Sequence, residues 1–166
     1  MQKTTQKNNI ISISTPLGKD TLYLTHLCAT EAISQLYSFT VSMFTVGTTI
    51  SLDGLVGKNV CVSLRNAESG GAIRYYHGVV SHLESTGMRT SAADDAADYI
   101  DYQAVIVPTA AFMKKRSNCR IYQNLSVIDI VADLFGQHSV AFQDKTTTDS
   151  SRFNIPWSNT VTFVPH

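Results

Sequence analysis

The sequence is short of charge. Charged residues make up 16% of its 166 residues, against about 25% in a typical globular protein. Lys plus Arg and Asp plus Glu number 13 each, so the formal net charge is zero. A chain without net charge has no long-range attraction to nucleic acid or to an anionic membrane. We therefore expect no nucleic-acid partner, and a surface with so few charges suits contact with another protein.

Cysteines and long apolar runs are scarce too. Cys28, Cys61 and Cys119 are far apart, odd in number and form no CxxC pair, which indicates reduced thiols. The polar stretch 1–9 lacks the apolar core of a signal peptide, and no window approaches the ~20 apolar residues of a membrane span. The sequence therefore predicts a cytoplasmic protein with no signal peptide and no membrane span.

Signatures of catalysis are also missing. There is no GxSxG elbow, and no cysteine stands in a recognisable catalytic context. The stretch Gly54–Lys58 has two residues between its glycines and is followed by Asn59. A phosphate-binding loop needs four intervening residues and a Ser or Thr at that place. We predict that the chain is not an enzyme, and we assign no catalytic residue.

Two charged clusters have simpler interpretations. The acidic cluster is Asp94, Asp95 and Asp98, and the basic cluster is Lys114, Lys115, Arg116 and Arg120. The acidic residues lack a second cluster and the spacing of a calcium loop. The basic residues lack the interleaved aromatics and overall basic charge of a nucleic-acid site. We interpret both clusters as solvated loops or turns.

Histidines give no clear metal site. His77 and His82 are five residues apart in one strand-like run, and an odd spacing predicts opposite faces of a regular strand. His26 belongs to another run, and no zinc-type ligand spacing is present. We assign no metal-binding or cofactor-binding residue, and we expect no cofactor.

What the sequence has is a succession of β-strand patterns around one central stretch. Ile73–Leu83 is aromatic and β-branched, and we predict a long strand that bends or bulges at Gly78. Alternating runs predict its partner strands at 10–14, 21–29, 38–46, 59–64 and 99–107. A short helical turn is expected at Ser51–Gly57, and the acidic, aperiodic stretch 84–98 is expected to be an exposed loop.

One helix is well signalled, at residues 126–136. Its apolar residues recur at helical spacing: Val127, Ile130, Val131, Leu134 and Phe135. Ser126 can cap it with Asp129 in a capping box, Leu125 can staple onto its first turn, and Gly136 can supply a left-handed stop. A strand-like run follows at 161–164 without an obvious partner, which suggests a truncated chain.

Many short strands and a single late helix predict a mainly β protein. We expect an antiparallel β-barrel with a partial second domain. The expected divisions are a flexible N-terminus (1–9), a first barrel (10–110), a connection with the helix that starts a second domain (111–142), and a truncated or poorly ordered tail (143–166).

Five stretches of the sequence follow one another in the same order as in the VgrG spike family of type VI secretion and resemble its N-terminal region. This family is related to contractile-phage baseplate hubs and late control protein D. Arg74–Val80, with the sequence RYYHGVV, is similar to the family's most recognisable string, R-x-[FY]-H-G-[IV]-V. The other four are Glu31–Ser34 with Phe39–Val41, Leu52–Val62, Tyr102–Pro108, and Arg120–Ile130. The resemblance covers about residues 20–138.

The resemblance implies a baseplate-hub type of barrel and a structural role in the type VI spike. The chain would be an N-terminal fragment that forms a homotrimer, docks on the tube of Hcp protein and joins the remaining spike domains. Export through the type VI machine itself would need no signal peptide. Two alternatives stay open: a truncated remnant that does not assemble, and a small barrel that binds a ligand or metal through His77 and the loop aspartates.

Overall fold

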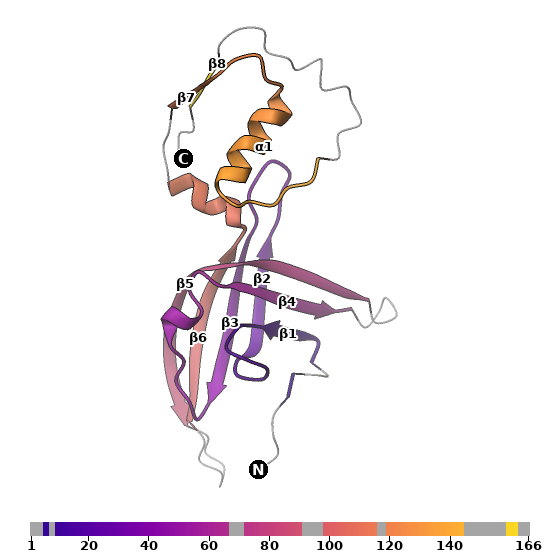
Figure 1. Cartoon of the computed structure of the whole chain (residues 1–166). Helices are drawn as coiled ribbons and strands as arrows, with labels where there is room; N and C mark the ends of the chain where they lie inside the picture. The colour runs from indigo at the N-terminus through magenta and orange to yellow at the C-terminus, as the bar shows by residue number, and fades with distance from the viewer. Residues whose placement is uncertain are drawn as a thin grey trace. The chain divides into compact units, whose positions relative to one another are not determined.

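The structure is a computed structural model, and Figure 1 shows its fold. It describes residues 5–6, 9–66, 72–90, 98–115 and 119–144, and the backbone of 159–162. The chain divides into two compact units, Met1–Pro108 and Thr109–His166. Each unit is described by itself.

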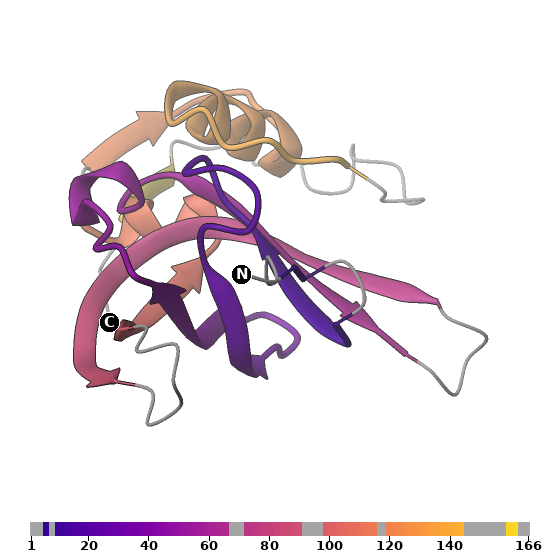
Figure 2. The ribbon, with the colours of Figure 1, turned by 90° about the horizontal axis from the view of Figure 1, so that it is seen from below.

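The first unit is one curled antiparallel sheet of six strands. In chain order they are β1 (Ile11–Ser14), β2 (Tyr23–Thr30), β3 (Ser38–Val46), β4 (Asn59–Arg65), β5 (Ile73–Thr90) and β6 (Asp98–Val107). In space the order is β1-β4-β5-β6-β3-β2. The strong curvature of β5 in Figure 2 brings the two end strands, β1 and β2, close together. The result is a nearly closed β-barrel, which confirms the predicted fold class.

The core of the barrel follows the period-two pattern of the sequence. In β3, Phe39, Val41 and Met43 are buried and alternate with partly exposed neighbours, as side chains on one face of a strand do. β4 and β6 contribute in the same way, and the 3-10 turn η1 (Leu52–Gly54) is followed by Leu55, which is fully buried. This packed interior leaves the outer face and the strand edges as the surfaces available for contacts.

Strand β5 is longer than the sequence pattern indicates. It continues to Thr90 and pairs with β6 down to Asp98, so the prediction of a loop over 84–98 is wrong for Glu84–Thr90; residues 91–97 lie outside the described part. From Glu84 onward every residue of β5 is exposed. A strand with no buried face has no alternation to detect, and only its ladder of backbone hydrogen bonds defines it.

Gly78 does not mark a bulge. It pairs in regular register with Val60 of β4, and the register shifts against β6 fall between Val80 and His82 and between Ser85 and Gly87. A Cβ added at Gly78 would lie 2.6 Å from Ile106 Cγ2 and 2.8 Å from the carbonyl oxygen of Val107. Glycine is required here because β6 passes too close for any side chain.

The second unit contains η2 (Thr109–Lys115), β7 (Cys119–Tyr122), α1 (Val127–Gln137) and β8 (Asn159–Thr162). Ser126 and Asp129 form the predicted capping box at the start of α1. Gly136 is not the stop: it lies inside the helix, and the left-handed residue is Ser139, with φ of 53°. The prediction that the final strand-like run lacks a partner is also wrong, because β8 pairs with β7.

Candidate assembly surface

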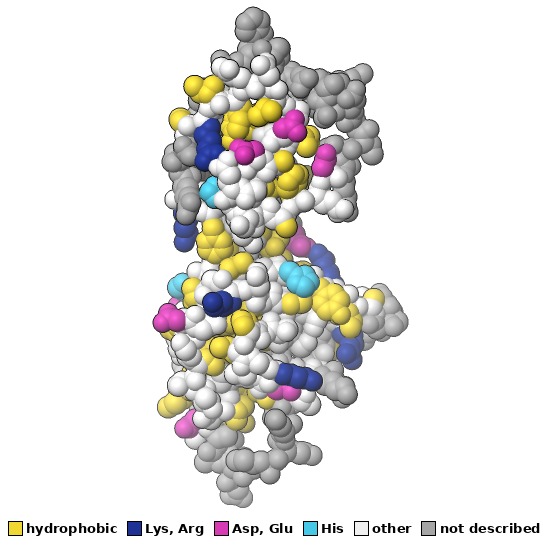
Figure 3. Space-filling model, in the orientation of Figure 1, with side chains coloured by type: hydrophobic (Ala, Val, Ile, Leu, Met, Phe, Trp, Pro, Cys, Tyr) yellow, Lys and Arg dark blue, Asp and Glu magenta, His cyan; other side chains and the backbone are white. Residues whose placement is uncertain are grey.

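The surface of the barrel unit carries few charges. On the face shown in Figure 3, single charged side chains are scattered among hydrophobic and uncharged ones. The features that could bind a partner are the edge of strand β2, the loop that follows it, and a groove on the outer face of β1 and β4.

The first half of the β2 edge is sealed by one side chain from the N-terminal segment. Gln6 is 7% exposed, and its amide lies between β1 and β2. Its Nε2 donates to the carbonyl oxygens of Leu22 (2.6 Å) and Ile13 (3.5 Å). Its Oε1 accepts from the backbone N–H groups of Ile13 (3.1 Å) and Leu24 (3.4 Å). One amide therefore satisfies backbone groups on both edges of the barrel seam.

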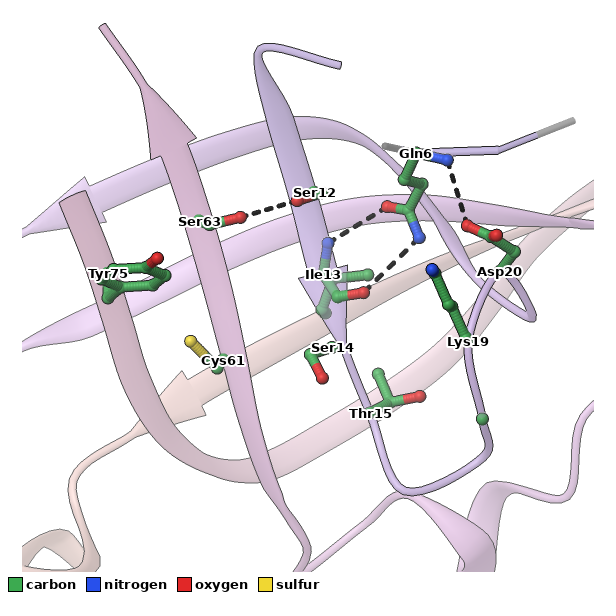
Figure 4. A pocket seen from close by; sticks show the side chains of 11 residues that line it. Gln6, Ser12, Ile13, Ser14, Thr15, Lys19, Asp20, Cys61, Ser63 and Tyr75 are labelled. Carbon is green, nitrogen blue, oxygen red and sulfur yellow. Dashed lines mark hydrogen bonds between the residues drawn. The ribbon is translucent and has the colours of Figure 1, made fainter. Parts of the chain in front are cut away.

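Asp20 fixes the segment that carries Gln6. Its Oδ1 accepts from the backbone N–H of Gln6 at 3.0 Å, and its Oδ2 accepts from Oγ1 of Thr5 at 3.2 Å; Figure 4 draws the first of these bonds. Thr5 and Gln6, within the stretch 1–9 that is expected to be flexible, are thus hydrogen-bonded to the barrel. The side chain that closes the barrel comes from a segment whose sequence is merely polar.

The second half of the β2 edge is open. β2 is the last strand of the sheet, and the residues from Thr25 to Thr30 are exposed except for partly buried Leu27. Within the described part of the barrel unit, no strand pairs with their outer side. The strand sequence YLTHLCAT contains no Lys, Asp, Glu or Pro, which are the residues that usually protect edges from pairing. The register shift between Leu24 and His26 separates the two halves.

The loop after β2 presents an apolar side chain and is tied at both ends. Ile33 is 97% exposed. On one side Glu31 pairs with Arg74 of β5. On the other side the hydroxyl of Tyr37 donates to the carbonyl oxygen of His77 at 2.9 Å, and its ring stacks on Phe39. The open edge and this loop form one continuous, mostly uncharged surface.

A groove lies on the outer face of β1 and β4, and Figure 4 shows its lining. Its volume is about 420 Å³. Its floor is made of small side chains, with Ser12 hydrogen-bonded to Ser63 at 2.6 Å. Tyr75 lies on the β5 side and Lys19 on the side of the β1–β2 turn. Oγ1 of Thr15 is buried, and none of the described residues forms a hydrogen bond with it.

Cys61 lines the same groove, opposite His77 in the register of β4 and β5. Its Sγ lies 3.8 Å from Nε2 of His77. Burial raises the pKa of the Cys61 thiol, which disfavours the nucleophilic thiolate. The pair provides neither a reactive thiol nor, with two possible ligands, a closed metal site.

The other histidines do not complete a site. The register shift in β5 displaces the alternation by one residue, so His77 and His82 both fall at exposed positions. The prediction that they face opposite sides assumed unbroken alternation, and that assumption is wrong. His26 is exposed on β2. Within the described ranges, no three His, Cys, Asp or Glu residues gather as metal ligands.

The two charged clusters are partly outside the described residues. Asp94, Asp95 and Arg116 lie there, whereas Asp98 accepts a hydrogen bond from Thr90 at 2.9 Å. Among the basic residues, Lys114 and Lys115 end η2, and Arg120 contacts Gln137 and Asp133. In the parts of the chain that the structure covers, no helix is long and apolar enough to cross a membrane.

Sequence reasoning missed Gln6, Asp20 and the open edge. Gln6 gives no signal within its polar stretch, because its role depends on strands that meet only when the sheet curls. The uncharged composition of β2 is visible in the sequence, but its position at the end of the sheet could not be predicted from it.

Comparisons with known proteins agree with this fold. Residues 30–162 match the family model of the phage tail baseplate hub (GPD). Two type VI secretion system spike proteins of Pseudomonas aeruginosa are similar: VgrG1c, 30% identical over 130 residues (78% of this chain, 17% of that protein), and VgrG1a, 28% identical over 139 residues (84% and 20%). The chain thus spans at most a fifth of the length of these relatives.

A solved structure is similar as well. The E. coli c3393 protein, described as a component of the type VI secretion system that resembles the T4 bacteriophage tail proteins gp27 and gp5, aligns with a TM-score of 0.59. The alignment has 16% identity and covers 84% of this chain and 38% of the other, so it supports the fold alone. From the match over 30–162, the chain belongs to the phage tail baseplate hub (GPD) family.

Proposed function

We propose that this chain is a hub component of a type VI secretion spike. In this role it forms a homotrimer, docks on the Hcp tube and joins the remaining spike domains. The observation that carries the proposal is the family match, which spans both structural units. The similar proteins named as type VI spike proteins specify the machine.

The β2 edge supports a role in assembly. An open edge offers a row of backbone donors and acceptors that only another extended strand satisfies in full. The exposed stretch from Thr25 to Thr30 is uncharged, and the adjacent Ile33 offers a large apolar side chain at the same end of the strand. Burying such a side chain at a contact contributes about 1.5–3 kcal/mol. Both features fit a subunit interface.

The proposed location follows from the same role. A hub component is made in the cytoplasm, where reduced Cys28, Cys61 and Cys119 are stable; no disulfide joins them in the structure. The chain would leave the cell only as part of the injected spike.

The test is the mass of the purified chain in solution together with its binding to Hcp. Sedimentation equilibrium should give three times the mass of the 18.2 kDa chain, and immobilised Hcp should retain the chain. Cys28→Lys is the variant to compare with the parent chain, because it places a charge on the open edge without touching the core. A parent chain that is monomeric and does not bind Hcp would rule out the proposed assembly.

A further inference from the structure

We propose that the N-terminal residues Thr5 and Gln6 guard a latent strand-binding site, the seam between β1 and β2. The strand that this guard excludes is the β2 strand of a second copy of the chain. The inference concerns the sealed half of the edge, and it rests on the proposed self-assembly only for the origin of the incoming strand.

One side chain occupies four backbone groups of the seam. The Gln6 amide has two donor hydrogens and one oxygen with two lone pairs. All of them are used: two carbonyl oxygens, of Leu22 and Ile13, and two N–H groups, of Ile13 and Leu24. On the β1 side it exchanges one donated and one accepted bond with a single residue, Ile13, as a hydrogen-bonded pair in an antiparallel ladder does. Gln6 therefore occupies a place that the backbone of another strand would also fit.

The guard is held at the β1–β2 turn by Asp20. Its carboxylate accepts from the backbone N–H of Gln6 and from the hydroxyl of Thr5. The carbonyl oxygen of Gln6 also accepts from the backbone N–H of Asn9 at 3.1 Å. Removing the Asp20 carboxylate would weaken this attachment and leave the Gln6 side chain itself unchanged.

A groove provides space beside the seam. The groove of about 420 Å³ is lined by Gln6 and Asp20 as well as by small side chains of β1 and β4. Oγ1 of Thr15, also in this lining, is buried without a hydrogen-bond partner among the described residues, although buried polar groups are normally hydrogen-bonded. An incoming strand would find room for its side chains there.

The β2 strand of a second copy is a suitable incoming strand. The outer half of β2 is exposed, uncharged and unpaired within the described barrel unit. When the β2 edge of one copy meets the seam of the next, two different surfaces are in contact, and such contacts form rings when they close. Gln6 would then limit strand pairing to the open half until the guard is displaced.

The test measures strand binding directly, on the full chain. The probe is a capped, fluorescent peptide with the sequence of residues 21–30 of this chain and Ser at the Cys28 position. Its affinity, from fluorescence anisotropy, is compared for the parent, Gln6→Ala and Asp20→Ala. We expect both variants to bind the peptide at least tenfold more tightly than the parent. Binding to the open half is common to all three, so the difference reports on the seam.

Lys19→Ala is the control, since Lys19 adjoins Asp20 and lines the same groove but has no part in the guard. If Gln6→Ala does not fold, Asp20→Ala decides, because it leaves every side chain of the seam in place. Equal affinity for the parent and the folded guard variants would overturn the proposal, and so would an equal gain in Lys19→Ala. A monomeric parent that shows the expected gain would count against the trimer and leave the guard intact.

Discussion

The two halves of strand β2 differ in what covers their outer edge. At Tyr23 and Leu24, and at Leu22 just before the strand, the edge is buried, and Leu22 and Leu24 are hydrogen-bonded to Gln6 through their backbone. From Thr25 to Thr30 it is exposed, and no strand of the described barrel lies beside it. Both halves have the same uncharged character in sequence. The difference arises from Gln6, which precedes Leu22 and Leu24 by 16 and 18 residues in the sequence.

This comparison separates two uses of an edge. A barrel that closed completely would have no edge for assembly, and one that stayed fully open would expose its core and aggregate. Here the half next to the core is sealed and the outer half is left free. The predictions below test first the closed side of the barrel, then the sealed half, then the open half.

The largest effect is expected for Gly78→Val in strand β5, which pairs with β4 on one side and with β6 on the other. The new side chain would collide with Ile106 and with the carbonyl of Val107, at 2.6 and 2.8 Å from its Cβ. Because one obstacle is backbone, we expect a loss of more than about 3 kcal/mol in the free energy of unfolding. Chemical denaturation measures it.

Gly87→Val is the matched control in the same strand. A Cβ at Gly87 has no atom within 4 Å, so its stability should stay within about 1 kcal/mol of the parent. Comparable stability of Gly78→Val and the parent would contradict the close approach of β6.

The second prediction concerns the sealed half. Gln6→Ala leaves the backbone groups of Ile13, Leu22 and Leu24 without this partner, and an unsatisfied buried group costs about 1–3 kcal/mol. Water reaching the seam offsets part of this, so we expect a loss of about 2–3 kcal/mol. Hydrogen exchange should show faster exchange at the amides of Ile13 and Leu24.

Gln35→Ala provides the comparison, since Gln35 is an exposed glutamine in the loop after β2. Its stability should change by less than about 0.5 kcal/mol. Similar losses in the two variants would mean that Gln6 does not seal the seam.

Much of this fold could be predicted from local patterns. The alternation in Ser38–Val46 identifies β3 within its true bounds, and Ser126 with Asp129 identifies the start of α1. The string Arg74–Val80 points to the family, which the match over 30–162 confirms. Each of these signals lies within a few residues of sequence.

The rest could not be predicted because it depends on distant partners. Glu84–Thr90 is a strand held by its ladder with β6, although neither of its faces is buried. The register shift after Val80 has no glycine to announce it. The pairing of β8 with β7 joins segments more than thirty residues apart. Local sequence patterns do not indicate which distant segments will pair in the folded chain.

The third prediction tests the open half. Cys28→Lys places an ammonium group on the exposed edge, where pairing with another strand would require its removal from water. Stability should change by less than about 0.5 kcal/mol, while self-association is lost. Sedimentation velocity measures the second effect. Met88→Lys, at a 69% exposed position of β5, should leave self-association unchanged; a loss there too would indicate a general effect of charge.

The smallest expected effect is a difference in thiol reactivity between the open edge of β2 and the groove on β1 and β4. Cys28 is exposed on the open edge, and Cys61 is partly buried in the groove. Burial raises the pKa of Cys61 above its usual 9.0. Since the thiolate is the reactive form, the alkylation rate of Cys61 in a Cys28→Ser, Cys119→Ser background should keep rising with pH beyond 9.0, where the rate of a thiol with the usual pKa levels off. Mass spectrometry follows the reaction. The matched chain that keeps only Cys28 should react faster at pH 8, because its sulfur is open to the reagent. Faster reaction of Cys61 would mean that the groove does not shield it, and that the outer face of β1 and β4 is as open as the edge of β2.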